Sequence, residues 1–532
     1  MELRNTNIKR LESEEFDALI VGGGINGAVS AAALAARGVH VALIDARDFA
    51  GFTSQQSSNL VWGGIKYMEG YEFGLVAGLC KSRNELLENF PSTVKEIRFL
   101  MTVNKQFRFH PWLILLSTWL YWLLGRGKTR TPRLVSPRQI KQIEPLINTF
   151  ISSAGIEYSD AFLHDNDARF VFNFVRSAMD KGCIAANYVE SKGSTRDSDG
   201  YWTTAVEDQV SGSQFTIRSK ILINAAGSFV DSLNELTGIE TEHRHLLSKG
   251  IHLIVPQISD SHRVLAFFAD DERLFFAIPM ANRTCIGTTD TRVDDPVTEV
   301  IDEDREFVLS NINARLDLPT PLTRDDIIAE RCGVRPLATQ KTSEASVEVQ
   351  RMSRKHVIEM KAEQNHISVF GGKLTDCLNV GNEICDCVSR LGLTLKQTGK
   401  WYGEPDRSAH DAFFKRARDL GLDEIVANDT GEILSTRLWR RYGADADAML
   451  DAIERDPSLC DPLIENAGIR RCEIKYLVEH EMIVKLEDYL RRRSKIELLV
   501  SRDALRQSAG LFEACEKLFG DEARQRFDEY FS

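Results

Sequence analysis

A glycine-rich loop near the N-terminus constrains the fold of this chain more than any other feature. Residues 22–27 (GGGING) carry the spacing GxGxxG, between an apolar run at residues 16–21 and an Ala-rich run at residues 28–37. Gly38 and a second apolar run at residues 39–44 follow. A strand, a helix and a second strand in this order predict a complete βαβ unit, so we expect the chain to begin with a Rossmann-type α/β domain.

The same loop predicts a bound dinucleotide. Gly22 permits the tight turn, Gly24 lets the backbone approach a pyrophosphate, and Gly27 lets the helix pack closely on the strand. Asp45 ends the second strand, where a carboxylate can bind the hydroxyl pair of a ribose. The loop alone does not distinguish FAD from NAD.

The composition excludes several classes of protein. The chain has 532 residues, which corresponds to about three domains. Its 66 Lys and Arg against 78 Asp and Glu give a net charge of −12, so we do not expect a nucleic-acid partner. Ten Cys without a CxxC pair indicate reduced core thiols. No metal site is expected at Cys385 and Cys387, because residues two apart on a helix point away from each other.

One segment raises the question of a membrane. Residues 1–15 mix acidic and basic side chains, so they predict no signal or transit peptide and a cytoplasmic location. Residues 112–124 (WLILLSTWLYWLL) are uncharged, but a helix of this length is about 20 Å long and too short to span a bilayer core of ~30 Å. Four cations follow, with no acid between them: Arg126, Lys128, Arg130 and Arg133. Residues 112–133 therefore predict either a helix in the membrane surface or a buried helix followed by a solvated basic loop.

The pattern changes near residue 400. Before it, helical and extended pieces alternate, and short extended runs between residues 253 and 360 suggest a separate antiparallel sheet. Beyond it, helical periodicity dominates, as in residues 434–454 and 473–493. The run Arg491–Arg493 is expected to be a solvated helix face that packs or pairs with acids.

Three later segments favour FAD over NAD. Residues 53–59 (TSQQSSN) lead into Gly63 and Gly64, whose bare backbone can lie against a flat ring. Residues 221–230 (ILINAAGSFV) predict a strand that ends on small residues. Residues 369–375 (VFGGKLT) predict a strand, a glycine turn and a helix start, and a helix N-terminus stabilises negative charge on a reduced flavin.

In this order, the segments resemble the FAD-dependent glycerol-3-phosphate dehydrogenases and oxidases of the D-amino-acid-oxidase-like flavoprotein superfamily. The resemblance covers nearly the whole chain and rests on GGGINGA, TS…SSN…GGIKYMEGYEF, EYSDA with NDARFV, NAAGSFVD, KGIHLIVP, IGTTDT, CGVRPL, FGGKLT and EIKYLVEHEMIVKLEDYLRRRS. It implies a Rossmann-type FAD-binding domain interleaved with an antiparallel-sheet substrate domain, followed by an all-helical domain. The implied FAD-binding residues are roughly 16–80, 150–240 and 355–400, the substrate domain is 81–149 and 241–354, and the helical domain is 401–532.

The resemblance also implies which residues contact FAD. It leaves open whether the flavin is covalently attached. The implied contacts are Gly22, Gly24, Ile25, Asn26, Gly27, Asp45, Thr53, Ser54, Ser58, Asn59, Gly63, Gly64, Val189, Ala226, Gly227, Gly372, Lys373, Leu374 and Thr375.

Family chemistry moves a hydride from C2 of sn-glycerol 3-phosphate to flavin N5 and gives dihydroxyacetone phosphate. On this chain the resemblance implies that His252 is the base, although a histidine in an apolar strand can also be an ordinary core residue. It implies that Arg335 contacts the substrate near the reacting carbon and that Lys373 lies at flavin and substrate. Arg354 is implied to bind the phosphate.

The chain departs from the family pattern at several positions. Lys66 and Tyr67, which are implied to bind the substrate, stand where the family has Arg-Tyr, and Lys lacks the bidentate fork of Arg. Trp62 replaces a histidine before the glycine doublet, Asn59 replaces a lysine, and Asp376 begins a stretch that replaces Thr-Tyr-Arg. We therefore expect a diverged member.

Several functions remain open at this point. The substrate is glycerol 3-phosphate, a different polyol phosphate, a 2-hydroxy acid or an amine, and a non-catalytic flavin-binding protein is a further alternative. The Trp-rich segment favours a membrane quinone over oxygen as the electron acceptor, with the protein peripheral on the inner face of the cell membrane. The sequence leaves homodimer formation open.

Overall fold

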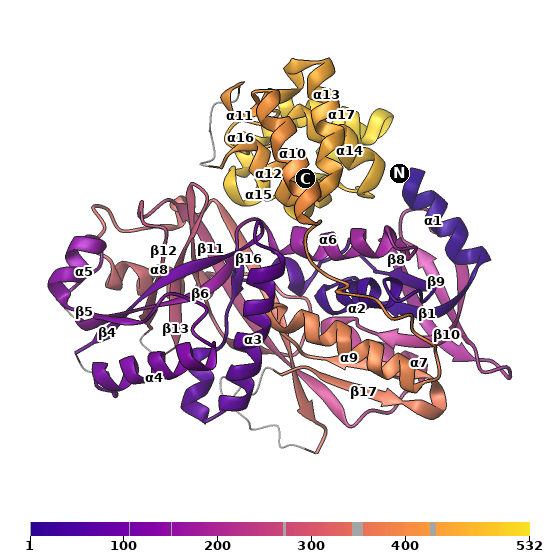
Figure 1. Cartoon of the computed structure of the whole chain (residues 1–532), viewed down its shortest axis with the longest axis horizontal. Helices are drawn as coiled ribbons and strands as arrows, with labels where there is room; N and C mark the ends of the chain where they lie inside the picture. Colours follow the sequence, from indigo (N-terminus) through magenta and orange to yellow (C-terminus); the bar gives the residue numbers. More distant parts are fainter. Residues whose placement is uncertain (1, 106, 151, 270–272, 343–354, 426–431) are drawn as a thin grey trace.

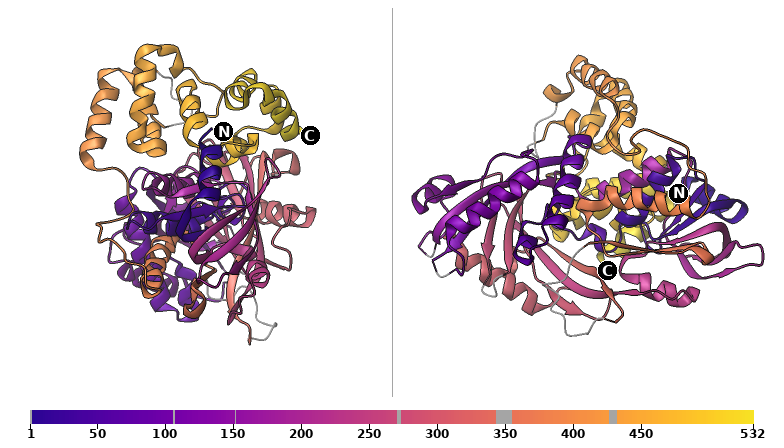
Figure 2. Two further views of the ribbon diagram at one scale, coloured as in Figure 1. Left: turned by 90° about the vertical axis from the view of Figure 1, so that its right-hand side faces the viewer. Right: turned by 60° about the horizontal axis from the view of Figure 1, so that its bottom comes forward.

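A computed structural model describes residues 2–105, 107–150, 152–269, 273–342, 355–425 and 432–532. Two sheet-based units lie side by side, and a helical domain formed by the C-terminal part of the chain lies against them (Figures 1 and 2). The predicted fold class, an α/β cofactor unit with an antiparallel-sheet unit and a helical domain, is confirmed.

The first sheet carries the glycine-rich loop. Its elements are β1 (Glu15–Val21), β2 (Val41–Ile44), β7 (Ile184–Ala186), β8 (Val189–Arg196), β9 (Trp202–Asp208), β10 (Gln214–Asn224), β17 (Val357–Lys361) and β18 (His366–Phe370), with α2 (Ile25–Ala35), α6 (Asp167–Met179), α7 (Val230–Thr237) and α9 (Cys377–Arg390). Strands β18, β10, β1, β2 and β7 run parallel in that order. Helices α2, α6 and α9 cover one face, and α7 packs on the other. All four residues of β2 are buried, as expected for a parallel strand covered on both faces.

The second sheet is mostly antiparallel. Its strands are β3 (Leu60–Val61), β4 (Val94–Asn104), β5 (Arg133–Val135), β6 (Ser152–Leu163), β11 (His243–Pro256), β12 (Arg263–Phe268), β13 (Leu274–Met280), β14 (Arg283–Gly287), β15 (Thr291–Val293) and β16 (Ala329–Gln340). Helices α3 (Phe73–Asn89) and α4 (Pro111–Leu124) pack on one face, and α5 (Pro137–Ile143) and α8 (Asp302–Arg315) on the other. Residues 152–163 were placed with the cofactor domain by the sequence, but β6 belongs here because it forms a continuous antiparallel ladder with β4.

The helices of the C-terminal part share a hydrophobic core of their own. They are α10 (Arg407–Asp419), α11 (Leu422–Ile425), α12 (Leu434–Tyr442), α13 (Asp447–Arg455), α14 (Arg471–His480), α15 (Ile496–Leu499), α16 (Arg502–Arg506), α17 (Ala509–Phe519) and α18 (Ala523–Phe531). The two predicted long helices are each interrupted. Gly443, with φ +58°, ends α12, and α14 stops before a π-helical turn, η10 (Asp488–Arg493).

The arginine run at the end of η10 is not a solvated face, so that part of the prediction is wrong. Arg491, Arg492 and Arg493 are each at most 4% exposed. The predicted pairing with acids is confirmed, because Arg492 Nε and Arg493 Nη1 both lie 2.8 Å from the carboxylate of Asp48. Arg492 also donates to Asp488 at 2.6 Å. The run therefore joins the helical domain to the loop after β2.

An N-terminal helix, α1 (Glu2–Ser13), was not predicted. Its buried Arg4 pairs with Asp208 at 2.5 Å, and Asn7 donates to the carbonyl of Ala185 at 2.8 Å. The helix is held by these polar contacts with the first sheet and by one buried apolar residue, Leu11. With so few apolar residues, the segment has no hydrophobic periodicity from which this helix could have been predicted.

The cysteines are free thiols, as predicted, and all of them except Cys332 are buried. Burial raises the pKa of the Cys385 thiol to about 11. Its sulfur accepts a hydrogen bond from Arg37 at 3.3 Å. Cys385 thus has the role of a core residue of α9.

Candidate functional site

The glycine-rich loop packs so closely that side chains are excluded from it. Gly22 has φ +107°, and a Cβ there would lie 2.5 Å from the carbonyl oxygen of Ala225. A Cβ at Gly27 would lie 1.8 Å from the carbonyl oxygen of Gly22. The loop, the start of α2 and the end of β10 therefore meet as bare backbone, which is the surface that a pyrophosphate needs.

Asp45 closes this loop from the end of β2. Its carboxylate accepts the N–H of Gly23 at 2.7 Å and that of Arg47 at 2.8 Å. Burial raises the pKa of Asp45 to about 7, although both backbone donors act in the opposite direction. Val189 reaches the same place, since its N–H donates to the Asp45 carbonyl at 2.8 Å. Asp45 thus holds the loop in shape, and its ribose contact stays a prediction.

Two polar side chains join the loop to other predicted cofactor segments. Ser54 Oγ accepts the N–H of Ile25 at 3.0 Å, and Asn26 Nδ2 donates to the carbonyl of Gly371 at 3.0 Å. The other amide atom, Asn26 Oδ1, is buried without a hydrogen-bond partner among the described residues, and a Cβ at Gly372 would lie 3.3 Å from it. A buried, unpaired acceptor beside a glycine turn fits a polar ligand group. The residues present therefore fit a dinucleotide such as FAD.

The residues that follow β10 lie against the segment at residues 53–59. Thr53 Oγ1 donates to the Val334 carbonyl at 2.7 Å and lies 3.5 Å from Ser228 Oγ. Beside Ser228, Gly227 has φ +58° and the Ala226 N–H donates within its own turn. Segments that are distant in sequence thus lie in contact here, and their contact with FAD stays a prediction.

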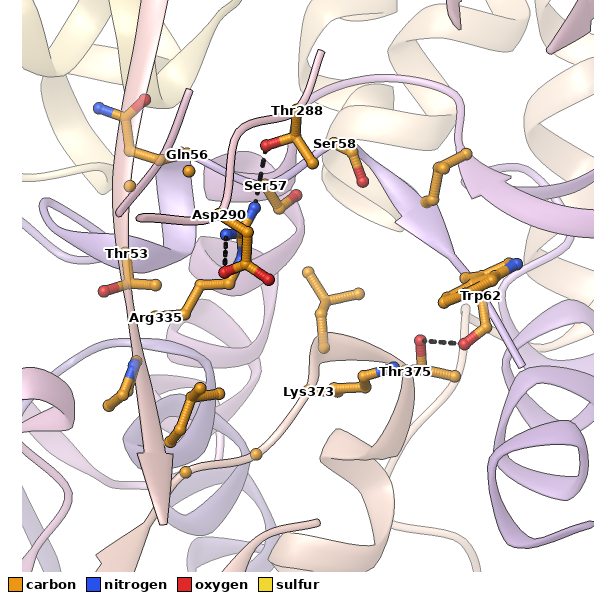
Figure 3. Close-up of a pocket in the computed structure, with 18 of the residues that line it drawn as sticks. Thr53, Gln56, Ser57, Ser58, Trp62, Thr288, Asp290, Arg335, Lys373 and Thr375 are labelled. Carbon is orange, nitrogen blue, oxygen red and sulfur yellow. Dashed lines mark hydrogen bonds and ion pairs between the residues drawn. The ribbon is translucent and has the colours of Figure 1, made fainter. Parts of the chain in front are cut away.

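A cavity of about 320 Å³ adjoins these segments (Figure 3). Leu60, Trp62, Leu274 and Phe276 give it an apolar wall. Gln56, Ser57 and the turn at residues 288–290 also line it and were not predicted. The predicted residues that line it are Thr53, Ser58, Lys66, Tyr67, His252, Arg335, Gly372, Lys373, Leu374 and Thr375.

Arg335 is held on the floor of this cavity by strand β16. Its Nη2 donates to Thr288 Oγ1 at 3.0 Å, and its Nη1 lies 3.5 Å from the carboxylate of Asp290 (Figure 3). A Cβ at Gly250, on the paired strand β11, would lie 2.0 Å from the guanidinium. The missing side chain of Gly250 therefore leaves the space that the guanidinium occupies. The contacts with Thr288 and Asp290 orient the guanidinium within that space.

His252 lies on β11, two residues after Gly250. It is 3% exposed, and neither ring nitrogen has a hydrogen-bond partner among the described residues. Burial, with the charges of Arg331 and Arg335, holds the pKa of His252 well below its usual range. Both ring nitrogens are therefore available to a ligand in the cavity, and the role of His252 as the base stays a prediction.

The depressed pKa of His252 predicts a pH-dependent stability. The unfolded chain protonates this ring below about pH 6.5 and the folded chain does not, so its contribution to stability is complete above that pH and is lost as the pH falls. His252→Gln should remove the effect, which reaches about 1.4 kcal/mol per pH unit. Thermal unfolding of both proteins from pH 7.5 to 5.5 measures it. Parallel curves would contradict the prediction, and His262→Gln, at an exposed position, should run parallel to the wild type.

Lys373 follows the glycine turn after β18 and is flanked by two aromatic rings. Its Nζ lies 5.3 Å from the centre of the Trp62 ring and 4.3 Å from that of Tyr67. Thr375 Oγ1 donates to the Trp62 carbonyl at 3.3 Å. Trp62, a departure from the family pattern, thus helps to place this ammonium through a cation–π contact.

Asn59 and Asp376, two of the departures from the family pattern, have hydrogen-bond partners outside the predicted site. Asn59 Nδ2 donates to the Asp165 carbonyl at 2.8 Å, away from the glycine-rich loop. Asp376 lies 3.0 Å from the ring of His356 and accepts from Ser82 at 2.9 Å. Asp376 is therefore not one of the described residues of this cavity. Arg354 lies outside the described residues.

The glycine doublet before Lys66 is fixed by a buried acid that sequence reasoning missed. The Gly63 N–H donates to the carboxylate of Asp160 at 3.2 Å, and Tyr121 of α4 donates to the same group at 2.6 Å. Arg83 Nη1 lies 3.1 Å from it. The available signal was an acid in the middle of the extended EYSDA run.

Comparison with known proteins agrees with this geometry. Residues 17–365 match the family model described as FAD dependent oxidoreductase, and residues 406–526 match the C-terminal domain of alpha-glycerophosphate oxidase. The aerobic glycerol-3-phosphate dehydrogenase of Staphylococcus aureus is 29% identical over 509 residues, which cover 91% of this chain and 88% of that protein.

Solved structures show the same architecture. The glycerol-3-phosphate dehydrogenase of Bacillus halodurans, complexed with FAD, matches 99% of this chain and 96% of its own with a TM-score of 0.75 and 25% identity. The L-alpha-glycerophosphate oxidase of Mycoplasma pneumoniae shares the fold over 74% of this chain and 98% of its own, with a TM-score of 0.55 and 17% identity. Because the first family model spans more than half of the chain and the site fits its cofactor, the chain belongs to the FAD-dependent oxidoreductases and uses FAD.

Proposed function

We propose that this protein oxidises sn-glycerol 3-phosphate to dihydroxyacetone phosphate. One observation carries the proposal: Lys66, Arg335 and Lys373 line the same cavity as the neutral ring of His252, next to the turn at Gly371 and Gly372. FAD, when bound, supplies the hydride acceptor. The names of the Staphylococcus and Bacillus relatives support the same substrate.

Each side chain has a task that its chemistry suits. The ammonium groups of Lys66 and Lys373 match the charge of a phosphate, and the guanidinium of Arg335 can bind a hydroxyl or carbonyl oxygen at the reacting carbon. A ring nitrogen of His252 accepts the hydroxyl proton, which it can do because the ring is neutral at neutral pH. Tyr67 and Trp62 hold Lys373 in place.

A second candidate is a related substrate with a different body. The apolar wall formed by Trp62, Leu60 and Phe276 favours such a substrate. The side chains of Leu60 and Phe276 cannot form hydrogen bonds with the second hydroxyl group of glycerol 3-phosphate. A 2-hydroxy acid would then replace glycerol 3-phosphate.

An anaerobic absorbance spectrum tests the proposal. Purified holoprotein should be yellow, and its flavin band should bleach promptly when sn-glycerol 3-phosphate is added. A yellow protein that stays oxidised with glycerol 3-phosphate but bleaches with another polyol phosphate, a 2-hydroxy acid such as lactate, or an amine moves the assignment to that substrate. A yellow protein that none of them bleaches would overturn the assigned reaction.

We also propose a quinone as the electron acceptor, reached from a membrane surface by helix α4. Six large apolar side chains of this helix are exposed, with Trp112, Leu116 and Leu123 each above 60%, so a buried helix is the wrong alternative. Among the described helices, none is long and apolar enough to cross a bilayer. The basic residues that follow are partly neutralised, since Lys128 pairs with Glu88 at 2.5 Å. Apolar contact therefore supports this location more than charge does.

Removing apolar side chains from α4 should release the protein from membranes. Each of Trp112 and Leu116 gains about 1.5–3 kcal/mol on burial, or about 3–6 kcal/mol together, so Trp112→Glu with Leu116→Glu should weaken binding by more than about 100-fold. Flotation with phosphatidylethanolamine–phosphatidylglycerol vesicles measures this. Leu236→Glu, which changes an equally exposed leucine on α7, is the matched control. Equal flotation of the double variant and the wild type would contradict the prediction.

A further inference from the structure

A second cavity, of about 600 Å³, lies between the helical domain and the second sheet. Helix α12 contributes Arg437, Arg440 and Arg441, and Lys495 follows from the segment after η10. Arg331 of β16 also lines it. This second cavity shares Ser58 with the first cavity, but its described lining includes none of Lys66, His252, Arg335 and Lys373, the residues assigned to the substrate.

The walls of this second cavity carry more positive than negative charge. With Lys95, six Lys and Arg side chains line it, against three carboxylates, those of Glu96, Asp165 and Glu432. One of these acids is already engaged outside the cavity, because Glu96 accepts from the backbone N–H of Arg130 at 2.9 Å. The cavity therefore has an excess of positive charge.

Of the two remaining acids, Asp165 is shared by three cations and Glu432 pairs with one. Asp165 accepts from Arg441 Nε at 2.9 Å, pairs with Arg440, and lies 3.8 Å from Lys495 Nζ. Glu432 pairs with Arg440 as well. One carboxylate facing three cations holds the pKa of Asp165 well below its usual range. Behind this wall the buried Glu473 pairs with Arg437 at 3.0 Å and with Arg441 at 3.3 Å. The positive charge that these acids leave least compensated is therefore that of Arg331, Lys95 and Lys495.

Arg331 is the most deeply buried of these cations. It is 1% exposed, and its Nη1 donates to Asn59 Oδ1 at 2.8 Å and to the Ser57 carbonyl. Its nearest described carboxylate, Asp167, is 3.9 Å away. Two further nitrogens, Nε and Nη2, have no hydrogen-bond partner among the described residues. A buried guanidinium with one distant carboxylate and two unpaired nitrogens is costly, and an anion nearby would relieve that cost.

We propose that this cavity is a second anion site, which binds the phosphate group of a small soluble molecule. Arginine forks suit tetrahedral oxyanions, and a phosphate can accept from Arg331, Lys95 and Lys495 at once, which a carboxylate with two oxygens does less well. The volume exceeds that of a phosphate ion, so a phosphomonoester or a diphosphate fits. The bound anion would join α12 to β16 and thereby stabilise the helical domain on the second sheet.

Calorimetric titration of the holoenzyme with inorganic phosphate and with pyrophosphate, at constant ionic strength, tests this site. Two sites are expected for phosphate, one in each cavity. Lys495→Met should weaken only the second-cavity site, by about tenfold, as expected for the loss of one charge-assisted contact. Lys66→Met should weaken only the first. Arg331→Met should weaken the second further, and Lys495→Met keeps the test decisive if that variant does not fold, because Lys495 is partly exposed.

The outcomes are distinguishable from those of the substrate proposal. A single phosphate site that is lost in Lys66→Met and unchanged in Lys495→Met would overturn the second site and leave the proposed reaction untouched. Acetate or chloride binding as tightly as phosphate would overturn the phosphate assignment. A protein that no glycerol 3-phosphate bleaches but that binds pyrophosphate in a Lys495-dependent manner would support this site and contradict only the proposed reaction.

Discussion

Gly27→Ala is expected to yield a protein that purifies with little or no FAD. The added Cβ would lie 1.8 Å from the Gly22 carbonyl oxygen, a backbone atom that cannot move unless the whole loop moves. Overpacking of this kind costs about 1–3 kcal/mol, or roughly a 10- to 100-fold loss of affinity for whatever the loop binds. The ratio of flavin absorbance to protein absorbance measures the result, with flavin affinity obtained by reconstitution.

Gly78→Ala is the matched control for this variant. Gly78 is also inside a helix, α3, but a Cβ there would meet no atom within 4 Å. The control should retain full flavin, and its stability should rise slightly because alanine is the better helix former. Full flavin occupancy in Gly27→Ala would mean that the loop is not where the cofactor binds.

The sequence predicted the elements whose signals are local. The strand, glycine loop and helix at residues 15–35 were predictable because glycine spacing and apolar runs decide them within a short window. Helix α1 was missed because it is held by contacts such as Arg4 with Asp208, which lie far apart in sequence. The same reason explains Arg491–Arg493, since the acid that neutralises two of them, Asp48, comes from the other end of the chain.

The candidate site divides along the same line. The cations Lys66, Arg335 and Lys373 were predicted to share a site, and they line one cavity. The destinations of Asn59 and Asp376 were not predictable, because each side chain is directed by a partner on another element, Asp165 for one and His356 for the other. Motifs indicate which residues meet, and side-chain direction depends on what packs beside them.

Arg335→Met is expected to reduce kcat/KM for glycerol 3-phosphate by about 100- to 1000-fold, which corresponds to roughly 3–4 kcal/mol of transition-state stabilisation. The guanidinium is held by Thr288 and Asp290 with room left by Gly250, so it is already oriented before substrate binds. Methionine fills similar space without charge or donors. Stopped-flow measurement of flavin bleaching under anaerobic conditions separates this effect from the later transfer of electrons to an acceptor.

Two further variants make the role of Arg335 specific. Arg335→Lys keeps the charge and loses the bidentate fork, so its rate should fall between those of the wild type and Arg335→Met. Arg196→Met removes an exposed arginine at the end of β8, which donates a hydrogen bond to the Gly200 carbonyl. The flavin of this variant should bleach at the wild-type rate. Flavin content should be equal in the wild type and the three variants, because the glycine-rich loop is unchanged. A bleaching rate for Arg335→Met within about threefold of the wild type, a difference of less than 1 kcal/mol, would remove Arg335 from the reacting centre and leave the substrate to the other cations that line the cavity, among them Lys66 and Lys373.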